Sequence, residues 1–129
     1  MQITEATQMY LETILVLSKG GQGVRSVDIA NHMGYSRPTI SEQMKRLRES
    51  GLIEMDDNAL ITLTDEGLAI AQTMWERHNL LAQMLMAIGV SEQTAREDAC
   101  RIEHDVSEET FECLKKHFQE SPDAGKNML

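Results

Sequence analysis

Aromatic side chains are scarce in this chain of 129 residues, which has one Trp, two Tyr and two Phe, together 4% of the sequence. Hydrophobic residues nevertheless make up 41%, and methionine is abundant, with nine residues. A core with few rings depends on aliphatic helix packing, in which the flexible Met thioether fills irregular gaps. The composition therefore favours a mainly helical protein of one domain or of two small ones.

Long apolar runs and a basic leader are also missing, and cysteine is sparse. No segment approaches the ~20 consecutive apolar residues that a membrane span requires, and the segment Met1–Glu5 shows no secretory signal. The two cysteines, Cys100 and Cys113, lie in helical patterns, where we expect thiols or metal ligands rather than a disulfide. The sequence thus predicts a cytoplasmic protein with no membrane partner.

Positive charge is outnumbered overall, since the formal net charge is −9, but it is concentrated in one region. Between Lys19 and Arg48 there are six basic residues and two acidic ones, whereas from Asp65 onward there are six basic and thirteen acidic ones. Such asymmetry indicates a nucleic-acid partner on the basic side. An acidic surface with a chance basic cluster is the alternative.

Helical periodicity and hydroxyl caps predict the order of the elements. A helix capped by Thr4 is followed by a short helix over 26–33, a helix opened by Ser36 and Pro38, and a hairpin of 52–55 and 59–63. A long helix then runs over about 65–88, and Ser91 and Ser107 open two more. This order is that of a winged helix-turn-helix followed by helices.

The expected fold is mainly α with a small β wing. We predict an N-terminal winged helix-turn-helix DNA-binding domain at residues 1–64 and a C-terminal helical metal-binding and dimerisation domain at residues 65–129.

The second helix of the helix-turn-helix has the side chains of a major-groove surface. Short polar groups and Pro38 suit base edges and thymine methyl groups, and basic groups reach phosphates. A helix-turn-helix used for protein contacts is the alternative interpretation. The candidate DNA-binding residues are Arg25, Ser36, Arg37, Pro38, Thr39, Ser41, Glu42, Gln43, Lys45, Arg46 and Arg48.

The segment from Glu97 to His104 is the most informative for metal chemistry. Cys100, Glu103 and His104 have the i, i+3, i+4 spacing of one helical face. Thiolate, carboxylate and imidazole together form a transition-metal ligand set.

Three further side chains are candidates at other positions. Met9 and Glu12, three residues apart on the first helix, offer a thioether and a carboxylate, and His78 lies in the long helix. Taken singly, each has an ordinary alternative: Met9 in the core, Glu12 in solvent and His78 in a hydrogen bond.

From about Thr4 to Phe118 the chain resembles the iron- and manganese-dependent repressors of the diphtheria toxin repressor family. The resemblance implies a metal-activated transcriptional repressor and not an enzyme. It also implies a homodimer that binds palindromic double-stranded operator DNA, controls metal-uptake genes and has no small organic substrate. The matching segments are Gln8–Ile14, Asp28–Ala30, Ser36–Ser41, Leu60–Gly67, Arg77–Leu81 and Ala99–His104.

The resemblance is mixed between the two branches of the family. Met9, Cys100, Glu103 and His104 match the primary site of the iron-responsive branch, whereas Glu12 and His78 match ligands of the manganese-responsive branch. At two ancillary-site positions of the iron branch the chain has Ala82 and Arg96, so that site is expected to be incomplete. The length resembles that of the short two-domain regulators, which lack the SH3-like domain.

Ligand softness orders the expected metals. A thiolate and a thioether in place of two carboxylates favour Fe(II), with Mn(II) next, and Co(II), Ni(II) or Zn(II) are further candidates in vitro. Two other regulators remain possible on the residues alone. One responds to oxidation of the Cys100 thiol, with His104 as a neighbouring base. The other responds to an organic ligand in an apolar cavity.

Overall fold

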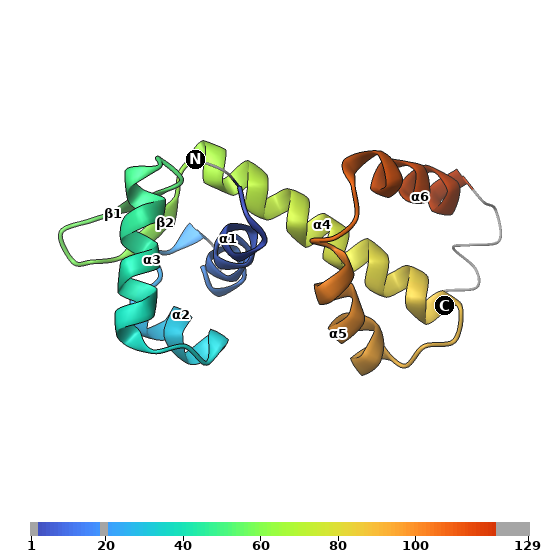
Figure 1. Cartoon of the computed structure of the whole chain (residues 1–129), viewed down its shortest axis with the longest axis horizontal. Coiled ribbons are helices and arrows are strands. Elements are labelled where there is room, and N and C mark those ends of the chain that lie inside the picture. Colours follow the sequence, from blue (N-terminus) through green and yellow to red (C-terminus); the bar gives the residue numbers. More distant parts are fainter. Residues whose placement is uncertain (1–2, 19–20, 121–129) are drawn as a thin grey trace. The chain divides into compact units, whose positions relative to one another are not determined.

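The computed structural model describes residues 3–18 and 21–120, and the chain divides into two compact units, residues 1–73 and 74–129. The predicted fold class is confirmed, because the described residues form six helices and one two-stranded antiparallel sheet (Figure 1). The predicted domain boundary after Thr64 stays a prediction. In chain order the elements are α1 (Glu5–Leu17), α2 (Ser26–Met33), α3 (Arg37–Glu49), β1 (Ile53–Met55), β2 (Ile61–Leu63), α4 (Asp65–Ala87), α5 (Glu92–Ile102) and α6 (Glu108–Glu120).

Hydroxyl side chains begin five of the helices, as the sequence predicts. In each case the hydroxyl oxygen accepts a hydrogen bond from the backbone N–H three residues further on, which satisfies a donor that has no partner within the helix. The starts of these helices are therefore encoded locally. The capping residues are Thr4, Ser36, Thr64, Ser91 and Ser107.

The turn and the wing of the N-terminal unit follow from short-range chemistry. Gly34 ends α2 with φ 74°, the left-handed conformation that costs glycine least. In the hairpin, Glu54 lies opposite Thr62. The Asp56 carboxylate accepts hydrogen bonds from the backbone N–H groups of Asn58 (2.8 Å) and Leu60 (2.9 Å), which fixes the tip of the wing.

One apolar core holds α1, α2, α3 and the hairpin of the N-terminal unit. Because α3 buries one face in this core, its opposite face stays available to solvent. The most deeply buried side chains of the core are Leu11, Ile14, Ile29, Ile40, Met44, Leu47, Leu52, Ile53 and Ile61.

The C-terminal unit has a smaller core between α5, α6 and the second part of α4. Its buried members are Leu80, Leu81, Ala82, Ala99 and Phe111. No helix among the described residues is long and apolar enough to cross a membrane.

Gly67 tests how closely α4 packs on the hairpin in the N-terminal unit. A Cβ added there would lie 2.0 Å from the Leu52 carbonyl oxygen, a backbone atom that cannot rotate away. Elsewhere in a helix Gly→Ala is stabilising. We expect Gly67→Ala instead to lower the free energy of unfolding by about 1–3 kcal/mol, measured by urea denaturation, because the added methyl group would overpack the contact with Leu52. The exposed Gln72→Ala is the control, and a stabilised Gly67→Ala would contradict the packing.

Candidate functional site

A fully buried carboxylate marks the end of α5. The side chain of Glu103 has an exposed fraction of 0%. Its backbone N–H donates to the Ala99 carbonyl at 2.9 Å, and its φ of −56° and ψ of −29° continue the helical conformation past Ile102. An ionised carboxylate away from water is strongly destabilising unless positive or polar groups surround it. Its neighbours therefore decide what this position can do.

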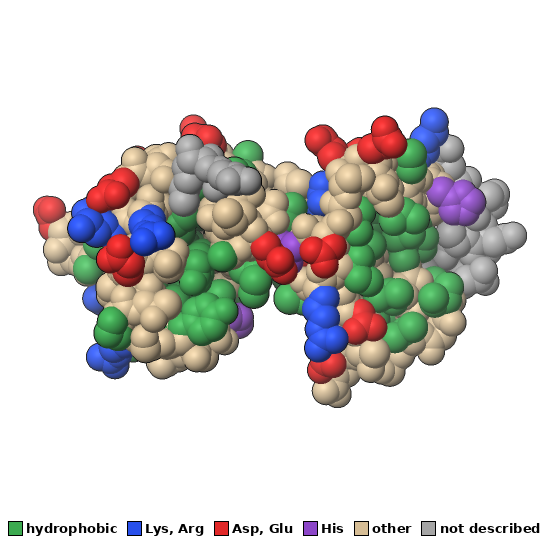
Figure 2. All heavy atoms as spheres, viewed as in Figure 1, with side chains coloured by type: hydrophobic (Ala, Val, Ile, Leu, Met, Phe, Trp, Pro, Cys, Tyr) green, Lys and Arg blue, Asp and Glu red, His purple; other side chains and the backbone are tan. Residues whose placement is uncertain are grey.

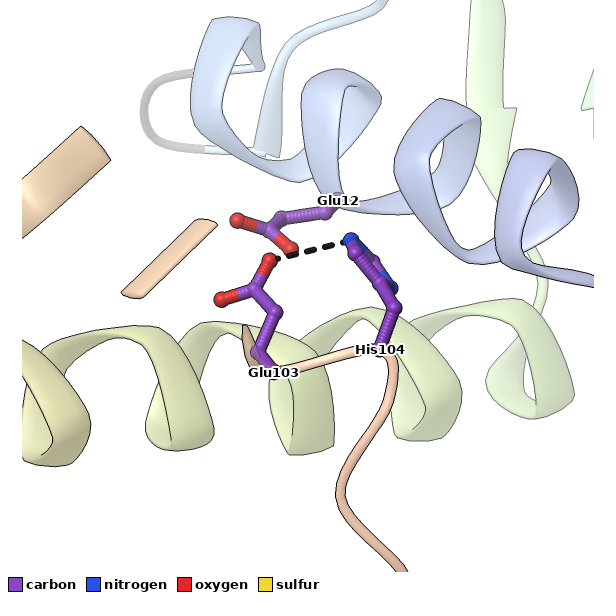
Figure 3. Close-up of side chains that lie close together, drawn as sticks. All are labelled: Glu12, Glu103 and His104. Atoms are coloured by element: carbon purple, nitrogen blue, oxygen red, sulfur yellow. Dashed lines mark ion pairs between the residues drawn. The ribbon is translucent and has the colours of Figure 1, made fainter. Parts of the chain in front are cut away.

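Two imidazoles lie against this carboxylate, one at each oxygen. His78 Nδ1 is 3.2 Å from Glu103 Oε2, and His104 Nε2 is 3.2 Å from Glu103 Oε1. Figure 3 shows the second pair, joined by the dashed line. The side chains of His78 and His104 are only 12% and 2% exposed. One carboxylate and two imidazoles are ligands that Mn²⁺, Fe²⁺ and later divalent ions accept, so the donor set fits such an ion.

The orientation of the His78 ring is restricted by its neighbour on α4. The indole of Trp75 stacks on the imidazole, with ring centroids 5.6 Å apart and an interplanar angle of 12°. Trp75 is also the single tryptophan of the chain. Its fluorescence therefore reports on the surroundings of His78.

The three predicted ligands of the segment 100–104 differ in their surroundings. Cys100 is exposed on α5, whereas Glu103 is fully buried. The α5 helix ends at Ile102, Glu103 keeps a helical φ and ψ, and His104 lies in the turn that follows directly. From this turn the His104 imidazole lies against the Glu103 carboxylate.

The two candidate ligands on α1, Met9 and Glu12, belong to the N-terminal unit. Both are partly buried, and they lie one helical turn apart. Glu12 is drawn with Glu103 and His104 in Figure 3. Within the C-terminal unit the structure brings together His78, Glu103 and His104. Participation of Met9, Glu12 and Cys100 in one ligand set stays a prediction.

Arg77 contacts the backbone next to Glu103 and His104, and the sequence patterns did not single it out as part of the site. Its Nη1 donates hydrogen bonds to the backbone carbonyls of Glu103 (3.2 Å) and Val106 (2.8 Å). An arginine directly before His78, in a helix whose next residues are mostly apolar, is the only sequence signal for it.

The predicted DNA-binding residues lie on the solvent side of the N-terminal unit. All are exposed except Gln43, which is partly buried. Some of them already have local partners: the Ser36 hydroxyl donates to the Thr39 hydroxyl at 2.8 Å, and Arg46 lies 3.5 Å from Glu42. An exposed pair of this kind contributes little stability, so it exchanges easily for a phosphate contact.

Arg25 has a different position, at the start of α2. Its Nη1 donates to the Asn58 carbonyl in the tip of the wing at 3.3 Å. The predicted DNA contact of Arg25 would therefore come from the side of the wing.

Two family models match the chain. Residues 2–59 match the N-terminal DNA-binding domain of iron-dependent repressors, and residues 64–126 match the metal-binding and dimerisation domain of iron-dependent repressors.

Relatives match over most of the chain. The transcriptional regulator MntR of Escherichia coli O157:H7 is 41% identical over 110 residues, 85% of this chain and 71% of that protein. The iron-dependent repressor IdeR of Mycobacterium leprae is 32% identical over 115 residues, 88% of this chain and 50% of that protein.

Solved structures of metal-responsive regulators have a similar fold. The manganese regulator SloR has a TM-score of 0.76 at 29% identity, with 94% of this chain and 56% of that chain covered. A manganese-dependent transcriptional repressor in complex with manganese also has a TM-score of 0.76, at 31% identity, with 86% of this chain and 51% of that chain covered. The chain thus spans about half the length of these two proteins.

Proposed function

The chain belongs to the diphtheria toxin repressor family of metal-dependent transcriptional repressors, and from that premise we propose that it binds palindromic operator DNA as a homodimer when loaded with Fe(II) or Mn(II). The genes that it controls are proposed to encode proteins of metal-ion uptake. The observation that carries the proposal is the buried Glu103 carboxylate with an imidazole at each oxygen.

The proposed ligand set has two parts. His78, Glu103 and His104 supply the buried donors of the C-terminal unit, and Met9, Glu12 and Cys100 are the further ligands. When bound, a divalent cation supplies the positive charge that buried carboxylates require. Because the set includes residues of α1, ligation restricts the position of the DNA-binding unit, and the ion favours the conformation that binds DNA.

The preferred ion follows from the softer members of this set. The Met9 thioether and the Cys100 thiol favour Fe(II). The hard carboxylates suit Mn(II), which is therefore expected to bind second best. Among the similar proteins, SloR is described as a manganese regulator and IdeR as an iron-dependent repressor. Co(II), Ni(II) and Zn(II) are expected to activate the protein in vitro.

DNA recognition is assigned to the exposed face of α3. Among the described residues, Arg37, Lys45 and Arg48 form no ion pair, and their exposed side chains are suited to phosphates, which supply affinity without sequence information. Ser41, Gln43 and the Pro38 ring are suited to base edges. The core that buries Ile40, Met44 and Leu47 on the opposite face holds α3 in place for this contact.

Dimerisation is assigned to the apolar surface of the C-terminal unit. A groove of about 490 Å³ lies between α4, α5 and α6, and nearly all of its lining is aliphatic or aromatic. Ile88 on its rim is 78% exposed, and Figure 2 shows hydrophobic side chains gathered on this unit. A second copy would cover the groove and place two recognition helices about 34 Å apart, one turn of DNA.

The groove is also the feature that favours an organic ligand as the signal. Its lining residues include Leu81, Met84, Ile102 and Phe118, with His117 as the one titratable side chain. A regulator that senses an organic ligand would bind DNA in the presence of chelator, and a thiol sensor would respond to peroxide without metal.

The proposed function predicts that DNA binding requires metal. A palindromic duplex obtained by in vitro selection is titrated anaerobically by fluorescence anisotropy at fixed salt, with chelator, Fe(II) or Mn(II). We expect the metal to strengthen binding by at least about tenfold, and Cys100→Ala to lose this gain. Equal binding with chelator and with metal would contradict the switch and favour an organic signal. A response to peroxide in chelator would favour a thiol signal.

Metal preference is predicted to depend on Cys100. Replacing the thiolate with a carboxylate removes the soft ligand, so Cys100→Asp is expected to shift the ratio of Fe(II) to Mn(II) affinity toward Mn(II) by on the order of tenfold. Competition with a fluorescent chelator under anaerobic conditions measures both affinities. Cys113→Asp, at the exposed cysteine of α6, is the matched control. An unchanged ratio in Cys100→Asp would show that Cys100 does not select the ion.

A further inference from the structure

Arg77 is a charged side chain buried inside the C-terminal unit, with only 9% of the residue exposed. A buried guanidinium is destabilising unless other groups replace its hydration. No carboxylate forms an ion pair with it among the described residues. The Nε of Arg77 is buried and has no hydrogen-bond partner among the described residues. The contacts that do hold it are therefore informative.

Two backbone carbonyls supply the first contacts: that of Glu103 at the end of α5 and that of Val106 in the segment before α6. The last carbonyl groups of a helix have no acceptor role within the helix, and a cation there is favoured by hydrogen bonding and by the helix dipole. Arg77 Nη1 donates to the carbonyls of Glu103 and Val106 at 3.2 Å and 2.8 Å. These two carbonyls lie on either side of His104 in the chain. The guanidinium thus fastens both ends of the turn that carries His104.

An aromatic ring on α6 supplies the other contact. The guanidinium carbon of Arg77 lies 5.1 Å from the centroid of the Phe111 ring, within the range of a cation–π interaction. Phe111 is 3% exposed and belongs to the core of the unit. Arg77 therefore links α4, the end of α5 and α6 through one rigid planar group.

The division of partners around Glu103 gives this link a specific consequence. The Arg77 guanidinium donates a hydrogen bond to the backbone carbonyl of Glu103, whereas the carboxylate oxygens of Glu103 face His78 and His104. A salt bridge from Arg77 to the carboxylate would compete with metal for those oxygens. Binding to the carbonyl fixes the residue and leaves its carboxylate to the site.

We propose that Arg77 is a positioning residue for the metal centre. Its guanidinium holds the turn Glu103–Val106, so that the Glu103 carboxylate and the His104 imidazole are in position for ligation before metal binds. This role rests on the proposed function, because it presumes that these side chains bind a divalent ion. It differs from a role in ligation, since Arg77 offers no ligand atom. It also connects the ligand-bearing turn to α6 through Phe111.

The test compares Arg77→Gln with Arg101→Gln, whose side chain is 81% exposed on α5. Mn(II) and Fe(II) affinities are measured anaerobically by competition with a fluorescent chelator, and the absorption spectrum of bound Co(II) reports the geometry of the ligands. Folding is followed by circular dichroism and urea denaturation in chelator. For Arg77→Gln we expect affinity to fall roughly ten- to a hundredfold with altered Co(II) bands, as when outer partners of metal ligands are removed. Arg101→Gln should match the wild type.

A purely structural Arg77 would give the opposite pattern. In that case Arg77→Gln would unfold more easily in chelator, yet bind metal with wild-type affinity and an unchanged Co(II) spectrum, and the proposal would be overturned. Failure of the wild-type protein to bind either ion would instead overturn the proposed function, and this role with it.

If Arg77→Gln does not fold, Arg77→Lys decides the question. The lysine keeps the charge but replaces the planar guanidinium with a shorter, single-point donor. We expect it to fold and to bind Mn(II) about three- to tenfold more weakly than the wild type, with altered Co(II) bands. Wild-type affinity and spectrum in Arg77→Lys would overturn the proposal.

Discussion

The burial of the Glu103 carboxylate is the constraint on which the C-terminal unit depends. An ionised group with no exposed surface needs compensation from every side, and here His78, His104 and, through the backbone, Arg77 provide the surroundings. Well-packed apolar residues are often at least as stable as buried ionic groups, whereas removal of one partner is strongly destabilising. A polar cluster retained in a small unit therefore points to function rather than to stability.

The two units meet different physical demands. The N-terminal unit buries long aliphatic side chains from α1, α2, α3 and the hairpin, which fixes α3 with one face in the core. Its described Arg and Lys side chains are exposed, and binding of a polyanion there displaces only weak contacts such as the exposed pair of Glu42 and Arg46. The C-terminal unit has a smaller apolar core, yet it buries Arg77 and Glu103 and leaves the His78 and His104 side chains only 12% and 2% exposed. Recognition and sensing thus use opposite arrangements of charge.

Much of the fold could be predicted because its signals are local. A hydroxyl cap acts on an amide three residues away, and Gly34 takes a left-handed conformation that the sequence alone suggests. The winged order of elements follows from these signals. The members of the buried cluster could be named from the sequence, since Glu103 and His104 are adjacent in the chain and the family resemblance adds His78; their role as metal ligands stays a prediction.

The remaining features depend on contacts between distant segments. The pairing of His78 with Glu103 spans 25 residues, and periodicity gives no information on which oxygen each imidazole faces. Periodicity likewise does not specify that α5 ends at Ile102 or that Cys100 is exposed. Arg77 was missed for the same reason, because its partners are backbone carbonyls, which leave no mark in the sequence.

The most direct test of the account is an anaerobic titration of Trp75 fluorescence with paramagnetic Mn(II), since Trp75 stacks on His78. The proteins compared are the wild type, Glu103→Gln, and Glu112→Gln at an exposed position of α6. If Glu103 is the central ligand, quenching is saturable in the wild type and in Glu112→Gln, and its midpoint rises by roughly a hundredfold or more in Glu103→Gln. A Glu103→Gln protein that titrates like the wild type would contradict the assignment of this buried carboxylate to a metal site.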